Sequence, residues 1–159
     1  MADDTLHRIY LAAPLFSQGE REWNRAFAAA LTEAAPGLAV TLPQDFRIGG
    51  RYNDPRHFDE LFRRCLGAIA ESDAVVAVLD GADTDSGVAV EIGYAYAAHI
   101  PVVGLRTDYR DNQDRGVNLM VAQACRQILR EYAFQEDVVQ LAGSVARRLR
   151  KVLAPRPPA

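Results

Sequence analysis

Hydrophobic and polar positions change along the chain in blocks that predict strands and helices in turn. Short apolar runs rich in β-branched residues indicate strands, whereas apolar residues three and four positions apart indicate amphipathic helices. The expected strands are 8–16, 38–43, 73–81, 100–107 and one within 125–134. The expected helices are 18–36, 58–72, one within 79–97, a short one within 117–124, and 135–153. A long polar loop, 44–57, separates the second strand from the second helix, and loops of this length often bind ligands.

Alternating strands and helices predict an α/β fold with a doubly wound, five-stranded parallel sheet. The segment 73–81 is almost continuously apolar, as expected of a central strand covered on both faces. Five strands suggest the flavodoxin-like order 2-1-3-4-5. We expect residues 1–153 of the 159 to form a single domain, followed by a disordered, proline-rich tail at 154–159.

In that strand order a crevice opens where the first and third strands lie side by side, beyond their carboxyl ends. Tyr10 to Phe16 and Asp85 to Glu91 should line it. Helical spacing sets Glu91 on or beside an apolar stripe with Val88 and Ile92. Because an unpartnered buried carboxylate costs several kcal/mol (about 2–7 even for a neutral polar group), Glu91 is a candidate functional residue.

These residues also have ordinary structural interpretations. Glu91 could pair with one of the many arginines, Tyr10 could be a core residue, and Asp85 or Ser86 could cap a helix. Their convergence at one crevice favours a site. A carboxylate with a tyrosine beside it can act as a nucleophile toward an anomeric carbon.

Composition and missing motifs exclude several other classes. A net charge of −3 argues against nucleic acid or anionic membrane as a partner, and no apolar run approaches the roughly 20 residues of a membrane span. The amino terminus lacks the features of a signal peptide, and Cys65 and Cys125 fit buried thiols better than a disulfide, so we expect a cytoplasmic protein. The three histidines lack metal-ligand spacing, and there is neither a P-loop nor a GxGxxG motif. We therefore expect no metal and no cofactor. The chain also does not fit a receiver domain of the same fold, which would need a lysine near its acidic site, because its single lysine, Lys151, lies in the last helix.

Five motifs together resemble one enzyme family. They are "IYLAAPLF", "LPQDF", "SDAVVAVLDG", "DSGVAVEIGYAYA" and "GVNLM", in this order over about residues 8 to 125. In these motifs the chain resembles the nucleoside 2-deoxyribosyltransferases. The resemblance implies the flavodoxin-like fold, a 2′-deoxynucleoside and a free nucleobase as substrates, and a homo-oligomer whose active sites are shared between subunits.

The same resemblance assigns roles to individual residues. Glu91 matches the nucleophile that attacks C1′ of the deoxyribose, Tyr10 the tyrosine that positions it, and Asp85 the aspartate that binds sugar hydroxyls. One double displacement, with two inversions and a covalent deoxyribosyl–Glu91 intermediate, would retain the anomer. Asn118 matches an asparagine that reaches in from the neighbouring subunit; its position alone suggests only a helix cap.

The base pocket is where this chain departs from the family pattern. Phe16 and Gln44 match base-pocket positions, one stacking and one hydrogen-bonding. The family often has an aspartate where this chain has Cys65, and a thiol is a weak hydrogen-bonding group. The leaving base would then take its proton from elsewhere, such as Asp45 or water.

Two other functions remain open from the sequence. A related N-glycoside hydrolase of nucleoside 5′-monophosphates would use the same nucleophile, and Ser17 and Arg21 could donate hydrogen bonds to its 5′-phosphate. The asparagine of "GVNLM", however, is better suited to bind a neutral hydroxyl. A non-catalytic nucleotide-sensing domain would have the same fold without the nucleophile.

Overall fold

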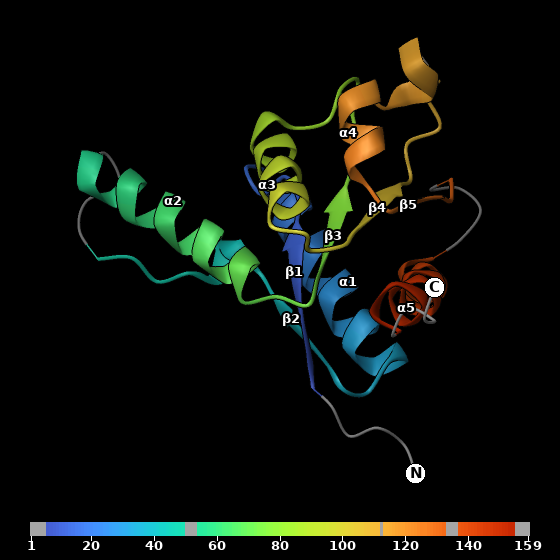
Figure 1. Ribbon diagram of the computed structural model, residues 1–159, viewed down its shortest axis with the longest axis horizontal. Coiled ribbons are helices and arrows are strands. Elements are labelled where there is room, and N and C mark those ends of the chain that lie inside the picture. Colours follow the sequence, from blue (N-terminus) through green and yellow to red (C-terminus); the bar gives the residue numbers. More distant parts are fainter. Residues whose placement is uncertain (1–5, 50–53, 112, 133–136, 155–159) are drawn as a thin grey trace.

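The fold is a five-stranded, all-parallel sheet with helices on both faces (Figure 1). The computed structural model describes residues 6–49, 54–111, 113–132 and 137–154. Its strands are β1 (His7–Ala12), β2 (Leu38–Thr41), β3 (Ala74–Val78), β4 (Val102–Arg106) and β5 (Gln127–Arg130). They lie in the order β2-β1-β3-β4-β5, which confirms the predicted sheet order.

The helices form two layers. One face is covered by α1 (Gln18–Ala34) and α5 (Val138–Leu153), which pack side by side, and the other by α2 (Pro55–Ala70), α3 (Ser86–Ala97) and α4 (Leu119–Ala124) (Figure 1). Two short 3-10 turns, Pro43–Asp45 and Gln113–Gly116, lie in the connections. The sheet therefore separates two apolar cores, as expected of a doubly wound fold.

Local chemistry shifts some boundaries from their expected positions. The second helix begins at Pro55 rather than at residue 58, because Asp54 accepts the amide of Arg56 as an N-cap and Pro55 occupies the first helical position. A 3-10 turn, Gln113–Gly116, occupies part of the polar segment after β4. The expected tail lies, apart from Ala154, outside the described residues.

Strand alternation decides which core each side chain of β1 enters. Ile9 and Leu11 face the core beneath α1 and α5, whereas Tyr10 faces the core beneath α2 and α3. Tyr10 pairs with Val75 of β3, so the loops that follow β1 and β3 leave neighbouring points on the same edge of the sheet. The predicted crevice would open at this edge.

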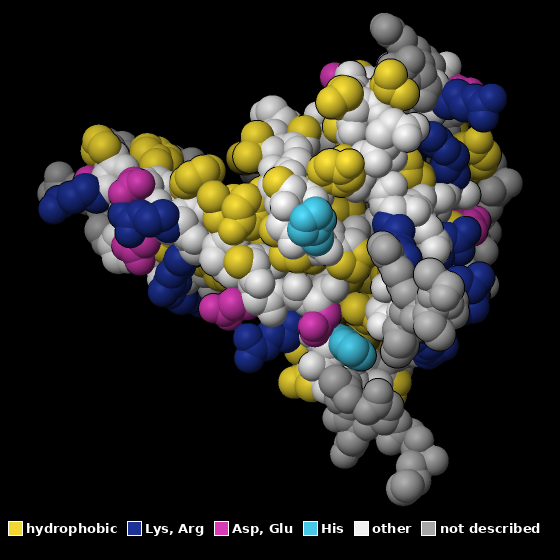
Figure 2. All heavy atoms as spheres, in the orientation of Figure 1, with side chains coloured by type: hydrophobic (Ala, Val, Ile, Leu, Met, Phe, Trp, Pro, Cys, Tyr) yellow, Lys and Arg dark blue, Asp and Glu magenta, His cyan; other side chains and the backbone are white. Residues whose placement is uncertain are grey.

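Several large apolar side chains remain on the surface. Figure 2 shows hydrophobic side chains along α2 and across α3 and α4, and α2 extends away from the sheet in Figure 1. Phe62 on α2 is 54% exposed and Met120 on α4 is 78% exposed.

Cys65 and Cys125 are free thiols. Both are half-buried, whereas we expected them to be buried. Among the described helices, none has the length and apolar character needed to cross a membrane.

Candidate functional site

A tyrosine and a glutamate meet at the switch point of the sheet. The hydroxyl of Tyr10 on β1 donates to Oε1 of Glu91 on α3 across 2.5 Å. Tyr10 is fully buried and Glu91 half-buried. On α3, Val88, Ile92 and Ala95 are buried against the sheet, and Glu91 lies on the flank of that face. Helix spacing thus brings the carboxylate over β1.

Burial dominates the electrostatics of this pair. The pKa of Glu91 is raised to about 7: burial is the largest cause, the hydrogen bond from Tyr10 opposes the shift, and the negative charge of Asp85 adds to it. The pKa of Tyr10 is well above its usual range, because of burial first and the adjacent carboxylate second. Among the residues that the structure describes, no salt bridge joins Glu91 to a basic side chain, so none of their arginines neutralises it. A carboxylate whose pKa is shifted to near 7 is common in catalytic sites.

Cys65 of α2 is the third member of this cluster. Its thiol is close enough to Tyr10 to contribute to the raised pKa of that phenol. Burial raises the pKa of the thiol, and the neighbouring charge of Glu91 adds to the effect. Cys65 is therefore a neutral S–H group at ordinary pH.

Asp85 caps α3 and also acts on Glu91. Its Oδ1 accepts the amides of Gly87 at 2.9 Å and Val88 at 3.1 Å, so the helix-cap interpretation is correct. The same carboxylate is close enough to raise the pKa of Glu91 by repulsion. Capping uses one oxygen, and among the described residues no hydrogen bond is made by Oδ2.

The loop between β3 and α3 is held by a buried arginine that sequence reasoning missed. Arg106, at the end of β4, is only 2% exposed. Its guanidinium donates to the carbonyls of Leu79 at 2.6 Å and Arg110 at 2.8 Å, and makes longer bonds to Gly81. A charged residue at the end of the apolar strand "VVGLR" is the available signal, but its partners are carbonyls that no motif marks. Arg106 thereby fixes the segment that leads to Asp85.

Phe16 and Gln44 lie outside the Tyr10–Glu91 cluster. Phe16 follows β1 and is 78% exposed. The Gln44 side chain is engaged within the chain, since its Oε1 accepts from Asn24 at 3.1 Å and its Nε2 donates to the carbonyl of Arg21 at 2.9 Å. Neither the exposure of Phe16 nor the contacts of Gln44 indicate a base pocket by themselves.

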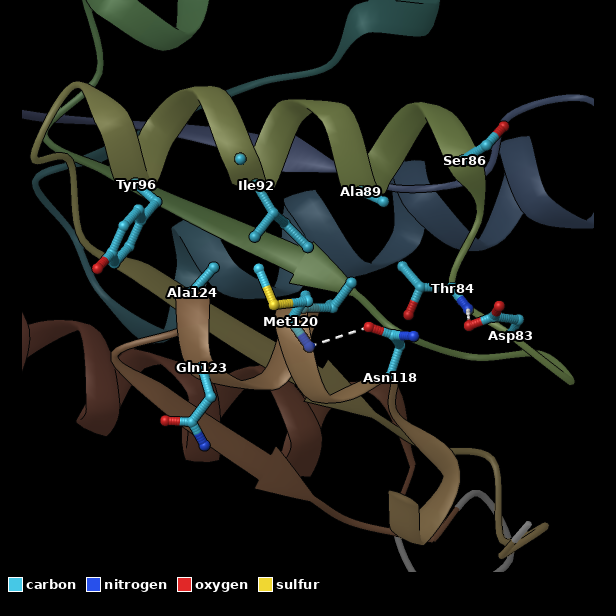
Figure 3. Close-up of a pocket in the computed structure, with 12 residues that line it drawn as sticks. Asp83, Thr84, Ser86, Ala89, Ile92, Tyr96, Asn118, Met120, Gln123 and Ala124 are labelled. Carbon is cyan, nitrogen blue, oxygen red and sulfur yellow. Dashed lines mark hydrogen bonds between the residues drawn. The ribbon is translucent and has the colours of Figure 1, made fainter. Parts of the chain in front are cut away.

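Asn118 lies on the other flank of α3. It lines a groove of about 600 Å³ between α3 and α4, together with Ala89, Ile92 and Met120 among others (Figure 3). Its Oδ1 accepts the amide of Met120 at 2.9 Å, so it caps α4 as its position suggested. Glu91 does not line this groove. Within one chain, the structure brings together Tyr10, Glu91 and Asp85, with Asn118 on a separate surface.

The sequence matches known proteins over most of its length. The family described as "Nucleoside 2-deoxyribosyltransferase" matches residues 9–120. A nucleoside deoxyribosyltransferase of Limosilactobacillus fermentum is 32% identical over 130 residues, which cover 73% of this chain and 74% of that protein. The matched region contains the whole Tyr10, Cys65, Asp85 and Glu91 cluster.

Solved structures share the fold. A conserved protein from Enterococcus faecalis superposes with a TM-score of 0.71 at 26% identity, over 91% of this chain and 99% of that one. A 2-deoxyribosyltransferase from Bacillus psychrosaccharolyticus has a TM-score of 0.66 at 22% identity, over 85% and 90% of the two chains. A CMP N-glycosidase from Clostridium botulinum has a TM-score of 0.55 at 18% identity, over 89% and 97%. The fold alone therefore does not distinguish transfer from hydrolysis.

Proposed function

This chain belongs to the nucleoside 2-deoxyribosyltransferase family, whose members are glycosyltransferases, and from that membership we propose that it moves 2-deoxyribose between nucleobases by a retaining double displacement. The observation that carries the mechanism is the hydrogen bond between Tyr10 and Glu91 in a buried setting. A carboxylate oriented by a phenol and stripped of water is a suitable nucleophile for an anomeric carbon.

In the first step Glu91 attacks C1′ of a 2′-deoxynucleoside. Because Oε1 accepts from Tyr10, Oε2 is the oxygen that forms the new C1′–O bond. The C1′–N bond breaks, and its electron pair leaves with the base, which takes up a proton. In the second step a nitrogen of the acceptor base attacks C1′ and gives up its proton to water, which replaces the proton taken up by the first base; the ester C1′–O bond breaks, and the carboxylate is restored. Two inversions retain the configuration, and no cofactor enters either step.

Protonation of the leaving base is the step to which the side chains of the protein contribute least. Cys65, with its raised pKa, is a poor donor. Asp45 forms a salt bridge with Arg25 at 3.4 Å on the exposed surface. We therefore propose water as the proton donor.

Substrate contacts follow from groups that retain bonding capacity. We propose that Oδ2 of Asp85 accepts a sugar hydroxyl while Oδ1 continues to cap α3. We propose that the nucleobase stacks on Phe16, whose ring is largely exposed in the free chain. Gln44 has one amide N–H left after its bond to Arg21, and this is the group we assign to the base.

Asn118 is proposed to act in a neighbouring subunit of a homo-oligomer. It lines the α3–α4 groove and not the Glu91 cluster, so its own chain offers it no route to the nucleophile on the opposite flank of α3. The groove is lined by Tyr96 and Met120, which are exposed large apolar side chains suited to a subunit contact, and Leu119 next to them in the sequence is exposed as well. We also propose that α5, which packs on α1 beyond the family match, belongs to the same single domain.

A nucleotide-salvage role in the cytoplasm accords with this chemistry. The substrates are free nucleobases and deoxynucleosides, and the two free thiols suit a reducing compartment.

The monophosphate hydrolase is less well supported by the loop after β1. Ser17 caps α1 by accepting the amide of Glu20, and the carboxylate of Glu20 closes the same helix terminus. Arg21 donates to the carbonyls of Leu15 and Gln44. The two groups expected to bind a 5′-phosphate are thus engaged, with a carboxylate beside them that would repel it.

The test is to incubate the protein with deoxyinosine and free adenine and to separate the products by chromatography. We expect deoxyadenosine and hypoxanthine in equal amounts. Free deoxyribose without deoxyadenosine would indicate a hydrolase, and a parallel reaction with deoxyinosine 5′-monophosphate would show whether the phosphate is required. Turnover of none of these substrates would contradict the proposal, and ligand binding without turnover would favour the sensing domain.

A further inference from the structure

The loops that follow β3 and β4 are joined by reciprocal hydrogen bonds. The carboxylate of Asp80, in the first loop, accepts the amides of Thr107 at 2.6 Å and Asp108 at 2.9 Å, and the hydroxyl of Thr107 at 2.5 Å. In the other direction, the amide of Gly81 donates to Oδ2 of Asp108 at 3.1 Å. Each loop thus supplies a carboxylate that binds amides of the other loop, and the two loops are held as one unit.

The guanidinium of Arg106 adds a third connection between the same loops. It donates to the carbonyl of Leu79 in the first loop at 2.6 Å and to the carbonyl of Arg110 in the second at 2.8 Å. Arg106 is almost fully buried, and an arginine stays protonated in proteins, so this charge depends on its hydrogen bonds. The position of each loop therefore constrains the position of the other.

Gly116 packs directly against this guanidinium. A Cβ at position 116 would lie 2.7 Å from Nη2 of Arg106, 2.8 Å from its Nε and 2.8 Å from the carbonyl oxygen of Arg110. Gly116 also has a φ of 78°, in the left-handed region that favours glycine. It stands two residues before Asn118, the N-cap of α4. The guanidinium therefore limits where the segment that leads into α4 can lie.

The two joined loops continue into the two helix caps that we assign to the sugar. The first loop leads to Asp85, the N-cap of α3, and the second leads to Asn118. The two segments also face each other, since Thr84, next to Asp85, lies at the same end of the α3–α4 groove as Asn118 (Figure 3). A change in the junction at Arg106 would therefore displace both caps.

We propose that Arg106 is a positioning residue that sets Asp85 and Asn118 relative to each other for binding of the deoxyribose. This inference rests on the proposed function, because that function assigns both residues to the sugar. Asp85 is assigned to the site of its own chain and Asn118 to the site of a neighbour. One buried guanidinium thus supports two active sites.

The Tyr10–Glu91 pair is held independently of this junction. Glu91 is bonded to Tyr10 of β1, and α3 is anchored beside it by Val88 and Ile92, which pack in the core on that face of the sheet. Loosening the junction should therefore weaken binding of the sugar and leave most of the chemical step intact. A purely structural defect has a different signature, because loss of folded enzyme lowers kcat and leaves KM unchanged.

Two variants weaken the junction by different routes. Arg106→Lys keeps the charge but replaces the planar fork of donors with a single ammonium group, which does not bond both loops in the same way. Gly116→Ala keeps Arg106 and places a methyl group against its guanidinium. Gly37→Ala is the matched control, because Gly37 also has a positive φ, 97°, and lies between α1 and β2, outside both loops.

The first measurement is the steady-state rate of transfer from deoxyinosine to adenine. In Arg106→Lys and Gly116→Ala we expect the KM for deoxyinosine to rise about tenfold, the effect of losing about one hydrogen bond, and kcat to stay within about threefold. Gly37→Ala should keep the KM of the unmodified enzyme. A fall in kcat at unchanged KM in both variants would show that Arg106 only stabilises the fold, and would overturn the proposal.

The second measurement does not depend on turnover. Hydrogen exchange reports on the amides that the two caps accept, which are Gly87 and Val88 at α3 and Met120 at α4. The proposal requires faster exchange at both caps in both variants, and at neither cap in Gly37→Ala. Faster exchange at one cap alone, or at none, would overturn it even if transfer is normal. Absence of transfer by the unmodified protein would refute the proposed function instead, and the exchange rates would still decide whether Arg106 links the two caps.

Discussion

The hydroxyl of Tyr10 and the carboxylate of Glu91, 81 residues apart in the sequence, are joined by a hydrogen bond of 2.5 Å. The bond orients one carboxylate oxygen and leaves the other for chemistry. It also opposes the burial that raises the pKa of Glu91 to about 7. The charge state of the proposed nucleophile is therefore decided near neutral pH by a balance between desolvation and this one bond.

The pH dependence of transfer should report that balance. Because only ionised Glu91 attacks, kcat/KM should rise with pH, pass its midpoint near 7, and level off above it. One pH unit below the midpoint, activity should be about a tenth of the plateau. Initial rates with a non-ionising donor nucleoside would check this. A flat profile between pH 5 and 8 would contradict a carboxylate with a raised pKa as nucleophile.

Replacing Tyr10 with phenylalanine should slow the reaction and shift the profile. Removal of the hydroxyl removes the one interaction that lowers the pKa of Glu91, so the acidic limb should move to higher pH. The plateau of kcat/KM should fall about 10- to 100-fold, because the carboxylate loses its orientation. Tyr94→Phe is a suitable control, since Tyr94 is a partly buried tyrosine on α3 that packs against the same core. If the acidic limb of the pH profile does not move in Tyr10→Phe, the hydrogen bond does not lower the pKa of Glu91.

Replacing Glu91 with glutamine should abolish transfer and stabilise the fold. Loss of the nucleophile should reduce the rate at least about a thousandfold, which is roughly 4 kcal/mol of barrier. A variant that keeps a tenth of the activity would exclude Glu91 as nucleophile.

The stability change should depend on pH in a defined direction. The folded-state pKa of Glu91, about 7, is above the ordinary pKa of 4.5 for a glutamate, so the folded state keeps the proton to higher pH. Stability from the neutral carboxyl is present below 4.5 and is lost as the pH rises through about 7. Glu91→Gln should therefore match the wild type in acid and exceed it above pH 7 by on the order of 2 kcal/mol, allowing for partial exposure. Urea unfolding at several pH values would test this.

The sequence predicted the strands and helices around this site more fully than the side-chain contacts within it. Apolar runs and helical spacing predicted the sheet order, and the switch point brought Tyr10 to the neighbourhood of Glu91. Arg106 could not be predicted in the same way, because its partners are backbone carbonyls whose positions depend on the tertiary fold. The closeness of Cys65 to Tyr10 depends on how α2 packs against the sheet, which no local pattern encodes.

Two substitutions of Asp85 should separate its structural and functional roles. Asp85→Asn keeps an oxygen for the amides of Gly87 and Val88, so stability should change little. Asp85→Ala loses the cap and should cost about 0.5–2 kcal/mol of unfolding free energy. Both remove the charge that raises the pKa of Glu91, so both profiles should shift to lower pH. If Asp85 binds a sugar hydroxyl, both should also raise KM for the nucleoside; an increase in Asp85→Ala alone would indicate a cap and nothing more.

Asn118 provides the test of shared active sites. Asn118→Ala removes both the cap on α4 and the amide proposed to reach a neighbour's substrate, whereas Asn118→Asp keeps a capping oxygen and loses the N–H donors. If the amide binds the 5′-hydroxyl of the sugar, both variants should weaken use of the nucleoside by about 1–3 kcal/mol. Activity lost only in Asn118→Ala would trace the effect to the helix cap.

Mixed oligomers of two impaired variants should regain activity. Glu91→Ala and Asn118→Asp subunits would be dissociated, mixed and reassociated, with exchange verified by mass spectrometry of the assembled protein. In a mixed pair, one site combines Glu91 of one chain with Asn118 of the other, and that site is intact because Asn118 lies in the α3–α4 groove rather than with Glu91. We expect recovery of up to about a quarter of the wild-type rate, the statistical share of sites with both residues in an equal mixture. Unmixed Asn118→Asp must be strongly impaired for the comparison to have contrast. Verified exchange without recovery would mean that each chain completes its own site, and that Asn118 serves only to cap α4.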